Sequence, residues 1–297
     1  MIWQSIHYLN RIGSQTYDNL HFTNNSECVY SFHYSTQMRY IDLEVLNERL
    51  PLIKKQFNDA KPFRYVMFEN FFPVEKANEI LNAYPKIQEG VWDGTTYIDQ
   101  RNKFQKTTFE PGSTLDAVFN ELNAPDFLNW LQRLTDMEDA LLGDSELFGG
   151  GLHQSTNGAF LNVHVDYNFH PKTKYHRRLN VLVYMNKDWK EEYEGHLELW
   201  DLTNNNKELL GKFAPLFNRC VIFETNEISF HGHPRPLNTP EGVNRKSLAT
   251  YYYTKTRPDN EVAVEHNTIY VNTEGVTGQV KRFNSGVKAF LERINKR

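Results

Sequence analysis

Apolar and polar residues alternate with a period of two through much of the second half of the chain. Runs of this kind, separated by polar turns, predict strands at residues 158–166, 177–185, 195–200, 219–224 and 247–254. Three consecutive glycines, Gly149–Gly151, precede these runs and mark a break in the pattern. Short strands at regular spacing after a helical region predict a barrel or jelly roll with helices on one face.

The part of the chain before these glycines has mainly the helical period. The pattern predicts a strand at residues 62–68 and helices over 73–84, 113–122 and 127–134. Pro73 stands at the start of the first helix. Ser113 is the predicted N-cap of the second, with Asp116 in the capping-box position. We expect these helices to support the sheet.

The two ends of the chain differ from this body. Residues 1–60 are mixed and polar, and a helix that begins near residues 41–46 should be disturbed by Pro51. We interpret this part as an extension packed on the main body and as a candidate oligomer contact. A C-terminal helix with an apolar stripe and a basic, solvated face is expected from about residue 278. The predicted divisions are an N-terminal extension at 1–60, a main domain at 61–257 with its jelly-roll core at 151–257, and a C-terminal helical extension at 258–297.

Residues 86–112 form a long polar and aromatic segment that is predicted to be a loop. Long loops are often lids or binding loops, but an ordinary surface excursion fits the pattern equally well. Trp92, Tyr97 and Arg101 are candidates for substrate contact on position alone.

Composition excludes several classes of function. A net charge of -4 and a pI near 6.3 give no attraction to nucleic acid or to an anionic membrane, so neither partner is expected. The two cysteines, Cys28 and Cys220, cannot build a disulfide framework or a cysteine zinc site, and a reducing compartment is the simpler assumption. The sequence shows neither a basic leader nor an apolar run of membrane-spanning length. We expect a soluble, cytoplasmic protein.

The stretch from Phe160 to Tyr167 carries the first candidate metal ligands. It is predicted to be a strand, in which alternate side chains share a face, so His164 and Asp166 can both reach one ion. Asn162 shares that face and is a candidate partner of the ligands and of a bound cofactor. Taken alone, such a triplet is more often a packed histidine beside a solvated aspartate.

A second stretch, Ser229–Pro234, follows an apolar strand and supplies His231 and His233. Two histidines and one carboxylate that leave coordination positions open are the arrangement of non-haem Fe(II) oxygenases. Zinc more often adds a third histidine or a cysteine. The pair in the first strand and one of these two histidines therefore form a candidate iron site, and the choice between the two histidines stays open.

A third stretch contains a candidate anion site. Arg245 and Ser247 share a face of the predicted strand, and a guanidinium beside a hydroxyl is suited to hold a carboxylate at the inner end of a pocket. Tyr184, at the end of an earlier strand, has a hydroxyl that can reach the same carboxylate. A surface arginine at the start of a strand is the alternative for Arg245.

Together these stretches resemble the Fe(II)/2-oxoglutarate-dependent dioxygenases, in particular the prolyl 4-hydroxylase-like branch. The resemblance covers about residues 62–256. Five motifs carry it in order: Asn162-Val163-His164-Val165-Asp166, residues 177–189, Gly195-His196-Leu197-Glu198-Leu199-Trp200, Ser229-Phe230-His231-Gly232 and Arg245-Lys246-Ser247. One departure is Glu194, because the family usually has Gly-Gly before the Leu-x-Leu strand.

The resemblance implies a double-stranded β-helix of the cupin-like kind and a defined site. The implied iron ligands and catalytic residues are His164, Asp166 and His231. The residues implied to hold 2-oxoglutarate are Arg245, Ser247 and Tyr184. His231 is preferred over His233 because the family pattern is Ser-x-His-Gly. The implied cofactors are Fe(II), 2-oxoglutarate as co-substrate and O2, with ascorbate as a supporting reductant.

The expected function is hydroxylation of an unactivated C–H bond with release of succinate and CO2. The substrate is a peptidyl proline, an amino acid or another small molecule, and its identity stays open, as do the regio- and stereochemistry. One alternative is a cupin-like metal-dependent isomerase or hydrolase, which gives Arg245 no role. Another is a retired jelly roll that acts as a binding module. The oligomeric state is left open, with a homodimer as one candidate.

Overall fold

The computed structural model describes residues 39–87, 92–97 and 100–273, and the side chains of all these except 93–97 and 205. The helices of this part are α1 (Leu43–Asp59), α2 (Val74–Asn82), α3 (Thr114–Leu122) and α4 (Pro125–Thr135). The strands are β1 (Tyr65–Phe68), β2 (Asp93–Tyr97), β3 (Gln100–Lys106), β4 (Gly151–Val165), β5 (His176–Tyr184), β6 (Leu197–Asp201), β7 (Glu208–Phe213), β8 (Arg219–Glu224), β9 (Phe230–His233), β10 (Arg245–Thr254) and β11 (Ile269–Tyr270).

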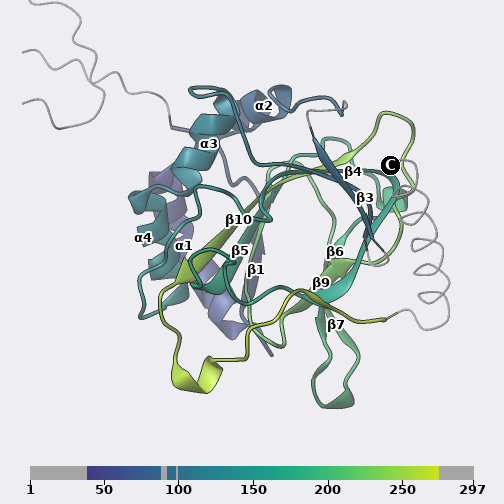
Figure 1. The fold of residues 1–297 in the computed structure, drawn as a ribbon. Coiled ribbons are helices and arrows are strands. Elements are labelled where there is room, and N and C mark those ends of the chain that lie inside the picture. The colour runs from purple at the N-terminus through teal and green to yellow at the C-terminus, as the bar shows by residue number, and fades with distance from the viewer. Residues whose placement is uncertain (1–38, 88–91, 98–99, 274–297) are drawn as a thin grey trace, which may run out of the picture. The chain divides into compact units, whose positions relative to one another are not determined.

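The strands belong to one antiparallel sheet that curls into a nearly closed barrel (Figure 1). Its main order is β1-β8-β5-β10-β4-β9-β6-β7, and the long strand β4 also pairs with β3 and β11. The helices gather beside the wall made of β1, β5 and β10 (Figure 1). The prediction of a mainly β, barrel-like fold with supporting helices on one face is confirmed.

Alternation along β5 and β8 separates two packing faces. Val181 and Ile222 belong to the apolar core that the strands share with the helices. The neighbours of Ile222 on β8, Val221 and Phe223, pack instead with Tyr184 and with residues of β6, a strand on another wall of the barrel. Because successive strand side chains point to opposite faces, the second group lines the barrel interior. Any residue in phase with Tyr184 on β5 therefore also faces the interior.

Helix α1 continues through Pro51, although the sequence predicted a disturbance there. Asp42 caps the helix by accepting a hydrogen bond from the backbone N–H of Val45. The buried stripe of the helix consists of Leu46, Leu50, Ile53 and Phe57. Proline removes one backbone hydrogen bond from a helix, and burial of this stripe against the core offsets that loss. The helix packs against α4 and β1.

The other helices begin and end close to the predicted residues. Ser113 caps α3 by accepting from the backbone N–H of Asp116. The Asp116 carboxylate accepts from the N–H of Gly112 rather than from that of Ser113, so the capping box is shifted by one residue.

The segment 86–112 is not an unstructured loop. Its described residues include β2 and β3, which form a hairpin, and β3 adds to the edge of β4. The prediction failed because these strands are polar and their pairing partner lies about 50 residues further on, so no local alternation marks them.

After β10 the chain continues along the barrel. Residues 258–273 include a short 3-10 turn at Asp259–Glu261 and the strand β11, which pairs with the end of β4 at His164 and Val165. The helix predicted from about residue 278 lies outside the described residues, as do residues 1–38. No helix among the described residues is both long enough and apolar enough to cross a membrane.

Truncation of a side chain in the shared core should destabilise the protein strongly. Ile222 lies on β8, between β1 and β5, and is fully buried in the core that the sheet shares with the helices. Ile222→Ala should therefore lower the free energy of unfolding by about 2–5 kcal/mol. The control is Leu52→Ala, because Leu52 is 63% exposed on α1 and its truncation should change stability by at most about 0.5 kcal/mol. Urea unfolding measures both, and equal effects would contradict the assignment of this face to the core.

Candidate active site

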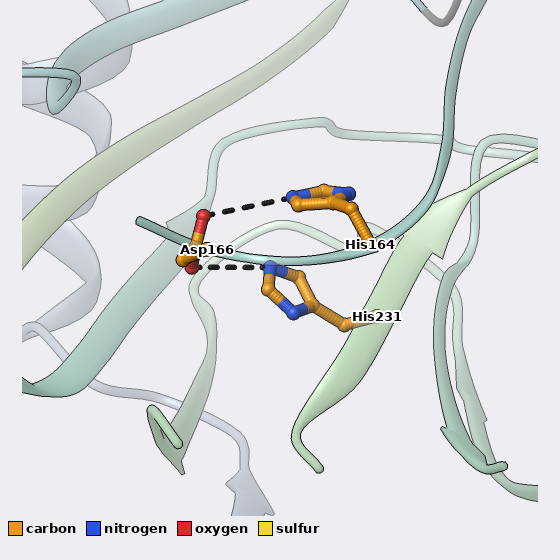
Figure 2. Close-up of side chains that lie close together, drawn as sticks. All are labelled: His164, Asp166 and His231. Carbon is orange, nitrogen blue, oxygen red and sulfur yellow. Dashed lines mark ion pairs between the residues drawn. The ribbon is translucent and has the colours of Figure 1, made fainter. Parts of the chain in front are cut away.

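Three side chains from two strands meet inside the barrel (Figure 2). His164 lies near the end of β4, Asp166 follows that strand, and His231 lies directly opposite His164 on β9. The Nε2 atom of His164 is 3.6 Å from Oδ1 of Asp166, and Nε2 of His231 is 3.4 Å from Oδ2. One ligand atom from each residue lies within 4.8 Å of the others. The structure thus brings together the three predicted ligands.

Both imidazole rings are held in the tautomer that leaves Nε2 free to bind a metal. Nδ1 of His164 is 2.8 Å from the backbone oxygen of Asn162, and Nδ1 of His231 is 2.9 Å from that of Ser229. A carbonyl oxygen can only accept, so Nδ1 carries the hydrogen and Nε2 keeps its lone pair. Histidines that bind metals are commonly oriented by bonds of this kind.

The carboxylate of Asp166 is fixed by two donors from β5. Its Oδ2 lies 2.9 Å from a terminal guanidinium nitrogen of Arg177 and accepts a 2.8 Å hydrogen bond from Asn180. Arg177 also donates to the side-chain oxygen of Asn180 and lies between the rings of Tyr167 and Tyr251, with its central carbon 4.4 Å and 3.6 Å from the ring centroids. Arg177, Asn180 and Asp166 therefore form one rigid group.

Protonation states in this group suit metal binding at neutral pH. Burial alone would raise the pKa of Asp166, but the positive charge of Arg177, with contributions from His231 and His164, holds this pKa well below its usual range. Burial, reinforced by the neighbouring His164, lowers the pKa of His231 to about 4. The carboxylate is therefore ionised and His231 is neutral at pH 7. Two imidazoles and one ionised carboxylate with an open side fit Fe(II).

Arg245 lies inside the barrel rather than on its surface, with 7% of its area exposed. It donates from Nε to the backbone oxygen of Gly195 at 2.7 Å and from a terminal nitrogen to the hydroxyl of Tyr184 at 3.3 Å. These are two of its five N–H groups. The alternative of a surface arginine is wrong, and Arg245 lies beside Tyr184, the residue whose hydroxyl was predicted to reach the same carboxylate.

Ser247 and Asn162 are buried at the positions that the strand pattern gave them. Ser247 is two residues beyond Arg245 on β10 and lies directly opposite Tyr184 on β5. For Asn162 the structure shows a backbone contribution, the carbonyl that orients His164. A contact of either side chain with 2-oxoglutarate stays a prediction.

The turn before β6 explains why Arg245 can fit. Gly195 has φ +71°, and a Cβ atom there would lie 2.3 Å from Leu237 and 3.1 Å from Cδ of Arg245. Glycine is therefore required next to the arginine. Glu194 stands where the resembling family usually has a first glycine, and it has φ 56° and ψ -146°, a conformation that is normally restricted to glycine. The residue that departs from the family pattern, Glu194, therefore has a strained backbone.

Two candidates from the segment 86–112 make contacts with other parts of the fold. Trp92 is buried, stacks on Tyr84 and donates to the backbone oxygen of Lys86. Arg101 donates two hydrogen bonds to the backbone oxygen of Gly158. The side chain of Tyr97 lies outside the described part of the structure.

The neighbouring histidines are not part of the triad. His196 is buried and its Nε2 lies 2.8 Å from a carboxylate oxygen of Glu191. His233 lies opposite Leu161, further along the β4–β9 pair than His231. The choice of His231 over His233 agrees with the observed cluster of ligand atoms.

Sequence reasoning did not identify three residues that shape this site. Arg177 and Asn180 appeared only as part of a matching motif. Their spacing of three along β5 does not follow the period of two of a strand, so the pattern did not place them on one face. Tyr270 on β11 places its ring 5.2 Å from that of His164, and it is about 100 residues from this histidine in sequence. These contacts depend on tertiary pairing, which no local pattern reports.

The metal-free protein should lose stability as the pH falls below about 6.5, partly because of His231. Its pKa is about 4 when folded and near 6.5 when unfolded, so the unfolded state binds a proton first and folding becomes less favourable as the pH falls. Between pH 7 and pH 5 this one residue should lower the free energy of unfolding by about 2 kcal/mol. In His231→Asn that part of the pH dependence should disappear in urea unfolding at the two pH values. An unchanged dependence would contradict the assignment.

Relief of the strain before β6 should stabilise the chain. Glu194→Gly should raise the free energy of unfolding by about 1 kcal/mol, because glycine adopts this conformation without strain. The matched control is Glu194→Ala, which removes the same side-chain contacts with Arg235 and His196 but keeps the Cβ atom. Thermal unfolding distinguishes them, and equal melting temperatures for the two variants would show that the backbone is not strained.

Comparison with known proteins agrees with this geometry. Residues 150–253 match the family model described as the 2OG-Fe(II) oxygenase superfamily. The matched segment includes the three predicted metal ligands and Arg245. No match was found among curated protein sequences.

Solved structures give the fold independently. A prolyl hydroxylase from Trichoplax adhaerens, in complex with a peptide fragment of the hypoxia inducible factor oxygen degradation domain, is similar with a TM-score of 0.52 and 17% identity, over 71% of this chain and 92% of that chain. A prolyl 4-hydroxylase from Phytophthora capsici has a TM-score of 0.50 and 16% identity, over 86% of each chain. Residues 150–253, which carry the triad, are thus similar in sequence to the 2OG-Fe(II) oxygenase superfamily, and the fold is similar to that of these two prolyl hydroxylases.

Proposed function

We propose that this protein is an Fe(II)- and 2-oxoglutarate-dependent hydroxylase that oxidises an unactivated C–H bond and releases succinate and CO2. The observation that carries the proposal is the convergence of three ligand atoms within 4.8 Å, in the same barrel as a buried arginine–tyrosine pair. The first group suits a metal with open positions, and the second suits the carboxylate of a keto acid.

The protein contributes position and electrostatics. His164, Asp166 and His231 would hold the metal from one side, and the oxidising chemistry is supplied by Fe(II) and 2-oxoglutarate when they are bound. The fixed Nδ1–H bonds of both histidines keep their Nε2 lone pairs directed at one point without reorganisation. Arg177 keeps Asp166 ionised and limits its rotation.

Arg245 would bind the far carboxylate of 2-oxoglutarate. A buried guanidinium is costly unless an anion or several acceptors satisfy it, and the described contacts occupy two of its N–H groups. A carboxylate that approaches from the barrel interior can accept from the remaining groups and from the hydroxyl of Tyr184, with Ser247 adjacent on the same face.

The substrate is proposed to be a peptide or a small molecule. The Trichoplax adhaerens prolyl hydroxylase of similar fold was solved with a peptide, which makes a peptidyl proline one candidate. A cupin-like isomerase or hydrolase would use the same three ligands without a keto acid and would leave Arg245 without a function. The burial of Arg245 beside Tyr184 favours the oxygenase.

Separate variants test the two halves of the proposal. With Ni(II) at about 100 times its dissociation constant, the wild type should gain about 2.7 kcal/mol of stability, and His164→Ala should gain little. Arg245→Met should keep the metal-dependent stabilisation but bind 2-oxoglutarate roughly 100-fold more weakly, because a charge-assisted contact is lost. Release of labelled CO2 from 2-oxoglutarate should be abolished in His164→Ala.

The control for the second variant is Arg235→Met, since the Arg235 side chain is 57% exposed and pairs only weakly with Glu194. Its affinity for 2-oxoglutarate should equal that of the wild type. If Arg245→Met also retained full affinity for 2-oxoglutarate, the isomerase or hydrolase alternative would be favoured.

A further inference from the structure

A lysine on β3 lies in the same cross-strand row as the proposed keto-acid anchor. Lys103 is directly opposite Ser155 on β4, and Ser155 is directly opposite Arg245 on β10. Directly opposed residues of antiparallel strands have their side chains on the same face. Neighbouring strands are about 4.8 Å apart, so the backbones of Lys103 and Arg245 are separated by about 10 Å.

Two observations place Lys103 on the interior face. Arg245, in its row, contacts Tyr184, whose ring packs among the interior residues. The next residue of β3, Phe104, packs against the core shared with the helices, which is the opposite face of the sheet. Since side chains alternate along a strand, Lys103 points into the barrel.

The electrostatic surroundings of Lys103 agree with this position. Burial lowers the pKa of Lys103 to about 8; the negative charge of Asp166 opposes this shift, and the positive charges of Arg245 and Arg177 reinforce it. Lys103 in turn contributes, after burial, to the lowered pKa of His153 on β4. The ammonium group is thus within electrostatic range of both the metal-binding carboxylate and the keto-acid anchor, and it is mostly protonated at pH 7.

Two arginines lie in the same described interior as Lys103. Arg177 is paired with Asp166, and Arg245 is assigned to the far carboxylate of 2-oxoglutarate under the proposed function. A further ammonium on the same face makes the interior attractive to a second anion. Because β4 lies between β3 and β10 in this row, the backbones of Lys103 and Arg245 are about 10 Å apart.

We propose that Lys103 binds an acidic group, a carboxylate or a phosphate, of the primary substrate, so that this enzyme hydroxylates an anionic compound or an acidic peptide. The inference rests on the proposed function, because it assumes that 2-oxoglutarate occupies Arg245. It makes Lys103 a residue that selects and positions substrate, while the metal ligands and Arg245 hold the reactants common to the class.

The test uses the full chain loaded with Mn(II) and saturating 2-oxoglutarate, since Mn(II) broadens the NMR signals of nuclei that bind near it. The probes are N-acetylglycine, its neutral counterpart N-acetylglycinamide, and methyl phosphate. In the wild type, both anionic probes should be broadened at lower concentration than the neutral one. The comparison of N-acetylglycine with methyl phosphate separates a carboxylate from a phosphate site.

Substitutions then assign the effect to one side chain. Lys103→Met should weaken binding of the anionic probes at least tenfold, whereas Lys103→Arg should keep it within threefold because the charge is retained. The affinity for Mn(II) and for 2-oxoglutarate should stay unchanged in both variants. The control is Lys172→Met, since the Lys172 side chain is 66% exposed and pairs with Glu146 outside the barrel.

Several results would overturn the inference. These are equal broadening of anionic and neutral probes in the wild type, no broadening by any anionic probe, and unchanged anion binding in Lys103→Met. A parallel loss of 2-oxoglutarate affinity in Lys103→Met would instead assign the lysine to the co-substrate. Failure of the wild type to bind 2-oxoglutarate with Mn(II) would refute the proposed function itself, and this outcome is distinguishable from the others.

Discussion

The buried ion pair between Arg177 and Asp166 holds the site together. It joins the residue after β4 to β5, two strands that are not neighbours in the sheet, and it lies between two tyrosine rings. Removing both charges from water costs several kcal/mol each, and the second donor from Asn180 and the stacked rings offset part of that cost. The pair therefore fixes the position and ionisation of a metal-binding carboxylate more than it adds net stability.

The same constraint organises the rest of the interior. Each of the two histidines is oriented by the backbone carbonyl of the residue two positions before it in the chain. The carboxylate needs a third strand, because its partners come from β5. Arg245 on β10 is held in turn by the Gly195 carbonyl, and the close approach there excludes any side chain at that glycine. Among the described residues, Arg177, Arg245 and Lys103 are the positive groups near the ionised Asp166, and they make this interior suited to anionic ligands.

Two neighbouring residues of the turn before β6 have different roles in placing Arg245. Gly195 provides the space that Arg245 needs, whereas Glu194 adopts a glycine-like conformation with a full side chain. The carbonyl of Glu194 accepts from the indole of Trp189, and its carboxylate is near Arg235 and His196. The hydrogen bond from Trp189 supports the turn that places the Gly195 carbonyl against Arg245.

The sequence alone was enough to predict the strands whose alternation is local, the helices with clear caps, and the shared face of His164 and Asp166. It was enough for these because a period of two or of 3.6 residues and a cap are short-range properties. Three features appear only in the folded chain: the β2–β3 hairpin, the strand β11 beside His164, and the partners Arg177 and Asn180 of Asp166. Each of these depends on pairing between segments far apart in the chain, where polar strands have no pattern of their own and the partner strand supplies the register.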